Sequence, residues 1–170
     1  MNKKKILIVC RGNIARSPFA EILINKELVK HGLVDKYVAI SRGIQGTWID
    51  PEMVRFPNIT MYVSLYKRMA PVLKRFGVDI SSHYSKTIDE KIVSQSSLIL
   101  AMDSKTKSAL ISLFPNTKDK IHHFSELVGS DADIEDLALI SSDDYLKVFT
   151  NIEQTVSKGF PNLLKILNHN

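Results

Sequence analysis

The chain has a single cysteine, Cys10, among its 170 residues, and it has no long hydrophobic run. One cysteine excludes an internal disulfide and is typical of proteins from a reducing compartment. The apolar stretches fall well short of the roughly 20 residues that cross a bilayer. The apolar run over 6–9 follows three lysines, but it is too short for a signal peptide, and Arg11 comes directly after Cys10. We therefore expect a cytoplasmic protein with no membrane partner.

A strong charge of one sign is also missing. The 23 basic and 18 acidic residues leave a net charge of +5, and the basic residues are spread along the chain without an arginine-rich arm. This distribution does not indicate a nucleic-acid partner. Hydrophobic residues make up 44% and charged residues 24%, which is ordinary for a globular chain. Because no repeat or linker divides the sequence, we expect residues 1–170 to form one domain and the protein to be a monomer.

One stretch combines features that point to chemistry. The apolar run over 6–9 ends at Cys10, and Arg16, Ser17 and Pro18 follow shortly after, where a helical pattern begins. A strand, a tight turn and a helix start of this kind direct backbone N–H groups and the positive end of the helix dipole at an anion. Arg16 adds a planar fork that suits phosphate, and the same positive groups favour a thiolate at Cys10. A thiolate beneath a bound phosphate ester is a nucleophile placed for in-line attack on phosphorus.

A plainer interpretation of Cys10 is a small buried hydrophobe at the end of a strand. Against it stand the spacing to Arg16 and the presence of Gly12 and Asn13 inside the turn. These residue types together favour an oxyanion-binding loop over an inert cysteine.

The rest of the chain alternates strand and helix patterns. Apolar runs predict strands over 6–9 and 97–102, and further strands are expected over 37–41 and 120–124. Helical spacing is found over 17–32, 59–76 (kinked or split at Pro71), 88–93, 103–114 and 143–167 (interrupted near Gly159 and Pro161), with long loops over 44–57 and 129–142. This order predicts an α/β fold with three layers, in which a four-stranded parallel sheet carries helices on both faces and the phosphate-binding loop follows the first strand. Cys10 then lies at the carboxyl edge of the sheet, where ligands bind.

The residues over 9–21 resemble the signature loop of the low-molecular-weight protein tyrosine phosphatases. The family pattern V-C-x-G-N-x-x-R-S-P-x-A-E matches at every fixed position. The resemblance implies a tyrosine phosphatase or acid phosphatase that hydrolyses phosphate monoesters through a phosphocysteine, without a cofactor or a metal. It implies a phosphorylated protein or a small phosphate monoester as substrate, Cys10 and Arg16 as catalytic residues, and a substrate-binding loop made of Arg11, Gly12, Asn13, Ile14, Ala15 and Ser17.

The residue that acts as general acid is harder to assign, because the family's D-P-Y-Y motif is missing. The best match places the family segment on residues 135–140, which makes Asp136 the expected acid; Asp133 and the absence of a functional acid are the alternatives. Leu137 replaces the family's proline, which predicts a looser loop. The two tyrosines that help to wall the substrate ring become Ala138 and Leu139, which predicts a wider and less selective pocket.

Several other residues match family positions, each with a plainer alternative. Ser41 and His83 are expected to support the loop, and Trp48 is expected to line the pocket. The plainer alternatives are that Ser41 is an ordinary strand-end serine and that Trp48 is an ordinary packed residue. Asn13 is expected to brace the loop. Ser17 can donate its hydroxyl to the thiolate, cap the helix, or do both.

Two rival functions remain. A thiol arsenate reductase on the same fold passes electrons through further cysteines, so this chain would need an external thiol. A non-catalytic phosphate-binding module is the other alternative, because the acid motif is missing. Hydrolysis of para-nitrophenyl phosphate separates the enzyme from the module.

Overall fold

The sheet is built from four parallel strands. The computed structural model describes residues 3–169, and its strands are β1 (Lys4–Cys10), β2 (Tyr37–Gly43), β3 (Ser96–Ala101) and β4 (Ile121–His123) in the order β2-β1-β3-β4. The register pairs Cys10 with Gly43, Val9 with Ala101, and Ala101 with His123. The carboxyl ends of all four strands therefore meet at one edge of the sheet, as the α/β prediction requires.

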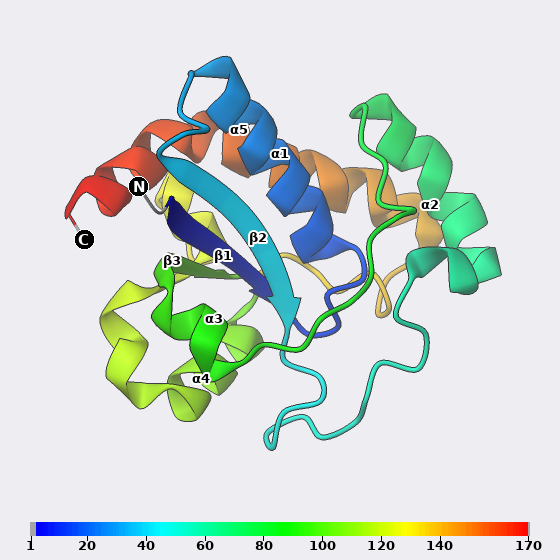
Figure 1. Cartoon of the computed structure of the whole chain (residues 1–170). Coiled ribbons are helices and arrows are strands. Elements are labelled where there is room, and N and C mark those ends of the chain that lie inside the picture. Colours follow the sequence, from blue (N-terminus) through cyan, green and yellow to red (C-terminus); the bar gives the residue numbers. More distant parts are fainter. Residues whose placement is uncertain (1–2, 170) are drawn as a thin grey trace.

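Helices cover both faces of the sheet (Figure 1). The helices α1 (Arg16–Lys30), α2 (Val63–Arg75) and α5 (Tyr145–His169) lie on one side, and α3 (Glu90–Ser94) and α4 (Ser104–Leu113) lie on the other. The side chains of β1 alternate between two cores: Ile6 and Ile8 pack on the α1 and α5 side, whereas Leu7 and Val9 pack on the α3 and α4 side. All four side chains are inaccessible to solvent. This confirms the predicted three-layer architecture, since a strand that is apolar at every position must be buried on both faces.

Short 3₁₀ helices fill the connections. They are η1 (Ile59–Met61), η2 (Pro115–Lys120), η3 (Phe124–Val128) and η4 (Ser142–Asp144). The segment over 44–57 contains neither helix nor strand, as predicted, apart from an isolated bridge between Gln45 and Asp50. Figure 1 shows it as a long excursion between β2 and α2.

Pro71 does not split its helix, and the predicted interruption near Pro161 was wrong. The helix expected over 59–76 is divided at Tyr62, between η1 and α2, and Pro71 lies inside α2. The terminal helix is not interrupted, and α5 runs through Pro161. Both prolines are exposed, so water can satisfy the carbonyl that each leaves without a partner.

Gly159 has a packing reason that the sequence pattern does not reveal. A Cβ atom at this position would lie 2.6 Å from Cβ of Leu127 in η3. A glycine here lets α5 approach η3 closely, and it does not mark the end of a helix.

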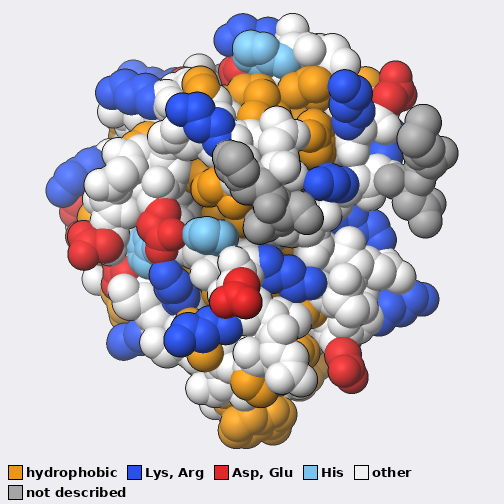
Figure 2. Space-filling view, turned by 90° about the vertical axis from the view of Figure 1, so that its left-hand side faces the viewer, with side chains coloured by type: hydrophobic (Ala, Val, Ile, Leu, Met, Phe, Trp, Pro, Cys, Tyr) orange, Lys and Arg blue, Asp and Glu red, His pale blue; other side chains and the backbone are white. Residues whose placement is uncertain are grey.

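The surface carries mixed charge. Figure 2 shows basic and acidic side chains interspersed over one face of the molecule. Within the part of the chain that the structure describes, no helix has both the length and the apolarity to cross a membrane.

Candidate active site

The turn after β1 is folded tightly against the end of β2. The main-chain N–H groups of Ile44 and Gln45 donate to the carbonyls of Cys10 (3.2 Å) and Arg11 (3.0 Å). A Cβ atom at Gly43 would lie 2.8 Å from the carbonyl oxygen of Arg11, so only glycine fits there. The strand-to-strand hydrogen bonding thus continues past β1 and shapes the start of the turn.

The next two carbonyls of the turn are also bound by residues outside it. Ser85 donates its hydroxyl to the carbonyl of Gly12 (2.7 Å), and Nε2 of His83 lies 2.9 Å from the carbonyl oxygen of Asn13. Since the N–H and C=O groups of a peptide point in opposite directions, carbonyls that face the scaffold turn N–H groups toward the cavity. This is the arrangement of a backbone anion site.

Asn13 is the hub of the turn. It is completely buried and adopts a left-handed conformation with φ of 53°. Its side-chain amide donates to the hydroxyls of Ser17 (3.1 Å) and Ser41 (2.9 Å), while its side-chain oxygen accepts from the N–H of Lys86 (3.0 Å) and contacts His83 (3.1 Å). A buried amide satisfied on every side holds the turn in one conformation.

The thiol of Cys10 lies inside this network. Its sulfur is 3.0 Å from the hydroxyl of Ser17 and receives the N–H of Asn13 at 3.2 Å. The Ser17 hydroxyl accepts from the Asn13 amide, which leaves its own hydrogen free for the sulfur. Two donors aimed at one sulfur stabilise a thiolate.

The predicted helix cap at Ser17 is wrong. The residue before α1 is Ala15, and it has no side-chain capping bond. Ser17 lies within the first turn of α1 and is fully buried. Its hydroxyl contacts Cys10 and Asn13 and does not cap the helix.

Ser41 and His83 contact Asn13 from two directions. Ser41 donates its hydroxyl to Glu21 at 2.5 Å, so it can accept the Asn13 amide. Burial is the main reason that the pKa of His83 is lowered from its ordinary value, and the positive charges of Lys86 and Arg42 add to it against the opposing influence of the Asn13 bond and Glu21. A neutral His83 still has one ring N–H, and with the hydrogen on Nε2 it donates to the Asn13 carbonyl.

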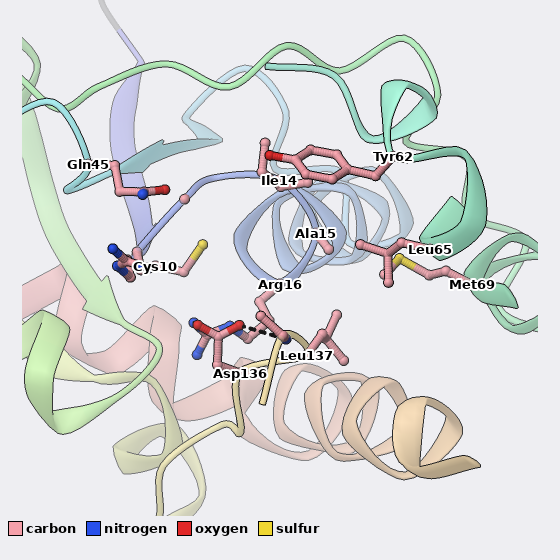
Figure 3. A pocket seen from close by; sticks show the side chains of 13 residues that line it. Cys10, Ile14, Ala15, Arg16, Gln45, Tyr62, Leu65, Met69, Asp136 and Leu137 are labelled. Carbon is pink, nitrogen blue, oxygen red and sulfur yellow. Dashed lines mark hydrogen bonds and ion pairs between the residues drawn. The ribbon is translucent and has the colours of Figure 1, made fainter. Parts of the chain in front are cut away.

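Arg16 connects the turn to the loop over 130–140, which we call the late loop. Its side chain is 4% exposed, and Nη1 donates to Asp103 (2.7 Å) and to the carbonyl of Ile134 (2.7 Å), while Nη2 pairs with Asp136 (3.0 Å; Figure 3). Burial is the largest influence on the pKa of Arg16 and lowers it, but the charges of Cys10, Asp136 and Asp103 together raise it above its ordinary value. The guanidinium is therefore a permanent positive charge beside the sulfur.

Asp103 contacts both α4 and Arg16. It caps α4 by accepting the N–H of Thr106 (2.7 Å), and its other oxygen binds Arg16.

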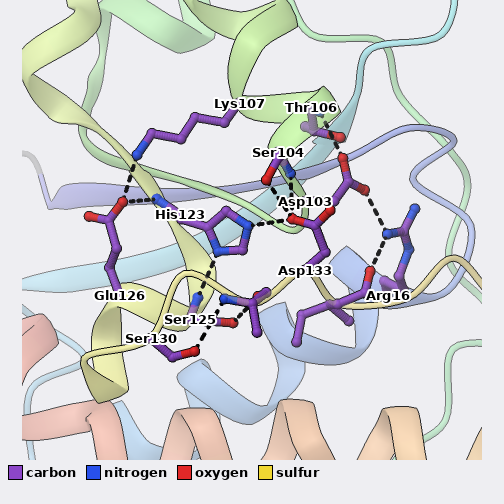
Figure 4. Close-up of polar contacts among 12 residues, drawn as sticks. Arg16, Asp103, Ser104, Thr106, Lys107, His123, Ser125, Glu126, Ser130 and Asp133 are labelled. Atoms are coloured by element: carbon purple, nitrogen blue, oxygen red, sulfur yellow. Dashed lines mark hydrogen bonds and ion pairs between the residues drawn. The ribbon is translucent and has the colours of Figure 1, made fainter.

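Asp133, the alternative acid, is engaged elsewhere (Figure 4). Its Oδ1 accepts from the N–H (2.8 Å) and hydroxyl (2.7 Å) of Ser104 and lies 2.9 Å from Nε2 of His123. Nδ1 of the buried His123 accepts the N–H of Ser125, which assigns the hydrogen to Nε2. Partial burial raises the pKa of Asp133, but the bonds from Ser104 and His123 outweigh it and lower that pKa overall. Asp133 thus ties the late loop to α4 and β4.

A cavity of about 240 Å³ opens above the turn (Figure 3). It brings together Cys10, Arg16 and Asp136, although they come from the turn and the late loop. The described residues that line it are Cys10, Arg11, Gly12, Ile14, Ala15, Arg16, Gln45, Tyr62, Leu65, Met69, Asp136, Leu137 and Ala138.

The other expected site residues lie in different places. Asn13 and Ser17, expected to bind substrate, are buried under the turn and do not belong to the lining, so they hold the turn. Trp48, expected to line the pocket, is 74% exposed and lies outside the lining, where Gln45 of the same loop is found instead. Arg11 does line the mouth, with its guanidinium held by Asp50 (2.8 Å) and Glu52 (3.3 Å).

Sequence reasoning did not assign Tyr62, Leu65 and Met69 to the cavity. The helical spacing over 59–76 predicted a buried face, and Met69 and Leu73 on that face are buried, whereas Met61 is half exposed. Spacing does not reveal which end of such a face opens onto a ligand site.

Comparison with known proteins agrees with this geometry. The family model described as low molecular weight phosphotyrosine protein phosphatase matches residues 5–169. The chain belongs to this family. The low molecular weight protein-tyrosine-phosphatase YfkJ of Bacillus subtilis is 29% identical over 161 residues, which cover 94% of this chain and 92% of the relative.

Two further relatives frame the range of the family. A crystal structure of the low molecular weight protein tyrosine phosphatase from T. tengcongensis superposes with a TM-score of 0.75 at 28% identity, over 94% of this chain and 99% of that one. Arsenate reductase 2 of Staphylococcus haemolyticus is 30% identical over 129 residues, or 76% of this chain and 82% of the relative. The low molecular weight phosphatase fold thus carries more than one named activity.

Proposed function

We propose that this protein hydrolyses phosphate monoesters, on phosphorylated proteins or small molecules, through a phosphocysteine at Cys10. The observation that carries the proposal is the convergence of Cys10, Arg16 and Asp136 on one cavity. The site combines a nucleophile, a cationic fork and a carboxyl group, which are the three parts that this chemistry needs.

The first step transfers the phosphoryl group to sulfur. The backbone N–H groups of the turn and the Arg16 guanidinium hold the phosphate oxygens, and the thiolate of Cys10 attacks phosphorus opposite the ester oxygen. The P–O bond to the leaving group breaks as the S–P bond forms. Asp136, acting as general acid, gives its proton to the departing oxygen, which leaves as the alcohol or phenol.

The second step returns the enzyme to its starting state. Asp136, now a carboxylate, takes a proton from a water molecule as that water attacks the phosphorus of the phosphocysteine. The S–P bond breaks, the thiolate is restored and inorganic phosphate is released. The Ser17 hydroxyl and the Asn13 N–H stabilise the sulfur as a leaving group, because both already lie within hydrogen-bonding distance of it.

Hydrolysis of para-nitrophenyl phosphate tests the proposal. Wild-type protein should turn it over, Cys10→Ser should lose nearly all activity, and Asp136→Ala should lose about 10²-fold in kcat. Asp131→Ala is the matched control, since Asp131 is exposed on the same late loop and lies outside the lining. Full activity in Cys10→Ser, or equal losses in the two aspartate variants, would contradict the assignment.

Arsenate reduction is the second candidate, favoured by the relatedness to an arsenate reductase. With one cysteine in the chain, the arsenate-bound thiol would have to be resolved by an external thiol. An assay of arsenate reduction with glutathione or thioredoxin, set beside the phosphatase assay, distinguishes the two.

A further inference from the structure

The last strand of the sheet ends in a buried histidine that faces the late loop. His123 is the final residue of β4, its side chain is 4% exposed, and its Nε2 lies 2.9 Å from Oδ1 of Asp133 (Figure 4). The proposed reaction steps do not involve this ring. It joins the edge of the sheet to a loop whose residues are mostly exposed.

Both ring nitrogens of His123 are engaged, so the ring has one orientation. Nδ1 accepts the N–H of Ser125 at 3.3 Å as the side-chain cap of η3, which leaves the hydrogen on Nε2. The main-chain N–H of His123 donates to Glu126 (2.9 Å), which also accepts from Lys107 (2.6 Å). A ring held at its other nitrogen and at its main chain presents the Nε2 hydrogen at a fixed point, as a side chain that positions another must do.

The bond from His123 meets two others at the same oxygen of Asp133. This oxygen also accepts the N–H (2.8 Å) and the hydroxyl (2.7 Å) of Ser104, the first residue of α4. Donors from β4 and from α4 thus hold one carboxylate between them, and hydrogen bonds to a charged acceptor are the strong ones. Without the bond from His123, Asp133 would be held from the α4 side alone.

The residues that follow Asp133 lead directly to the site. The N–H of Ile134 donates to the carbonyl of Met102 (2.9 Å), and the carbonyl of Ile134 accepts from Nη1 of Arg16 (2.7 Å). Two residues further along, Asp136 pairs with Nη2 of Arg16 (3.0 Å). Because these contacts all lie within three residues of Asp133, a shift of Asp133 moves the proposed general acid as well.

From this chain of contacts we infer that His123 is a positioning residue, which acts through Asp133 to hold Asp136 where the leaving-group oxygen needs a proton. The inference rests on the proposed phosphatase function and adds to it a residue from the edge of the sheet. His123 is not among the described residues that line the cavity, so its effect on the reaction passes through the late loop. A misplacement of about 1 Å in a reacting group can cost about 10²-fold in rate.

Two substrates with different leaving groups test this role. Para-nitrophenolate departs readily without a proton, whereas the phenolate of phenyl phosphate needs one. The ratio of kcat/KM for phenyl phosphate to that for para-nitrophenyl phosphate therefore reports how well the general acid is placed. In His123→Leu, which removes the N–H and keeps an apolar side chain in the space, this ratio should fall about tenfold. His123→Gln puts an amide N–H near the place of Nε2 and should keep most of the ratio.

His122→Leu is the matched control. His122 is the neighbouring residue of β4, but alternation along the strand turns it to the other side, where its Nδ1 lies 3.0 Å from Glu126. The same substitution there should leave the ratio within about twofold of wild type. Thermal unfolding of each variant shows whether it is folded, and the ratio cancels any loss of active protein.

A double variant shows whether His123 acts through Asp133. Asp133→Ala alone should lower the ratio, and adding His123→Leu should lower it little further, because the bond between the two side chains is already gone. If His123→Leu does not fold, His123→Met takes its place in every arm, since the flexible methionine side chain fills irregular space.

The outcomes separate the two proposals. If wild-type protein hydrolyses neither aryl phosphate, the proposed function fails. If it hydrolyses both, three results would overturn the role of His123 and leave the phosphatase function standing. These are an unchanged ratio in His123→Leu, an equal fall in His122→Leu, and a full additional fall when His123→Leu is combined with Asp133→Ala.

Discussion

The turn over 11–15 and the late loop over 130–140 face the same cavity but are held in different ways. Four successive carbonyls from Cys10 to Asn13 are bound by the surrounding scaffold, and Asn13 is completely buried. The late loop is tied at Asp133 and at Ile134, whose N–H donates to Met102 at 2.9 Å, while most of its other residues are exposed. The proposed anion site is thus fixed by many contacts, and the position of Asp136, the proposed general acid, depends on few.

Breaking the turn should have the largest effect. Asn13→Ala removes the amide that binds two serines and Lys86, and it puts alanine where φ is positive. We expect a loss of about 3 kcal/mol in the free energy of unfolding and about 10²-fold or more in kcat, measured by denaturation and phosphatase assay.

Asn25→Ala is the control for that variant. Asn25 also makes two side-chain hydrogen bonds, to the N–H and carbonyl of Ala39 on β2, but it lies away from the cavity. It should lose stability while keeping kcat. Equal losses of kcat in the two variants would mean that the turn is no more sensitive than the rest of the sheet.

Loosening the late loop should have an intermediate effect. Asp133→Ala removes the bonds to Ser104 and His123, and Asp136 is then less well positioned. We expect kcat to fall about tenfold for phenyl phosphate, whose leaving group needs a proton, and much less for para-nitrophenyl phosphate. A purely structural role for Asp133 would lower both rates alike, and Asp131→Ala again provides the control.

The smallest effect concerns the pH dependence of stability. Burial lowers the pKa of His83 in the folded protein below the value of about 6.5 expected when it is unfolded. As the pH falls through about 6.5, the unfolded chain takes up a proton that the folded state resists, so stability declines toward acid pH. His83→Gln should show a shallower decline between pH 7.5 and 5.5, measured by thermal unfolding in matched buffers.

That pH window lies above the range in which Glu126, a carboxyl group with a strongly shifted pKa, takes up its proton. Partial burial raises the pKa of Glu126, but bonds from Lys107, His123 and His122 outweigh it and lower the pKa to about 2. Its contribution to stability is therefore lost only below about pH 4.5. Parallel curves for wild type and His83→Gln above pH 5.5 would show that His83 is not the group responsible.

The same contrast explains how much of the site could be predicted from the sequence. The turn is local: Cys10, Asn13 and Arg16 lie within seven residues, and their spacing alone indicates the chemistry. The role of Asp136 depended on an alignment among crowded aspartates, and no local pattern shows that Asp133 binds His123. Such contacts join segments that are distant in sequence, and residue spacing contains no record of them.

The fold shows a similar division. All four strands were predicted, and the signal was strongest for β1 and β3, because a strand buried on both faces is apolar at nearly every position. Pro71 and Pro161 were misleading, since an exposed proline is tolerated inside a helix that tertiary packing supports. The place of Leu65 and Met69 in the cavity lining was missed because the same helical periodicity describes both a core face and a ligand-facing end.

Gly43 extends the signature of this site beyond the stretch that a motif search would report. A side chain there would collide with the main chain of Arg11 and Gly12, although β2 is a separate strand. Grafting residues 9–21 onto another scaffold would therefore transfer the reactive residues without the end of β2 that shapes their loop. A transplant of this chemistry has to carry the end of the neighbouring strand as well.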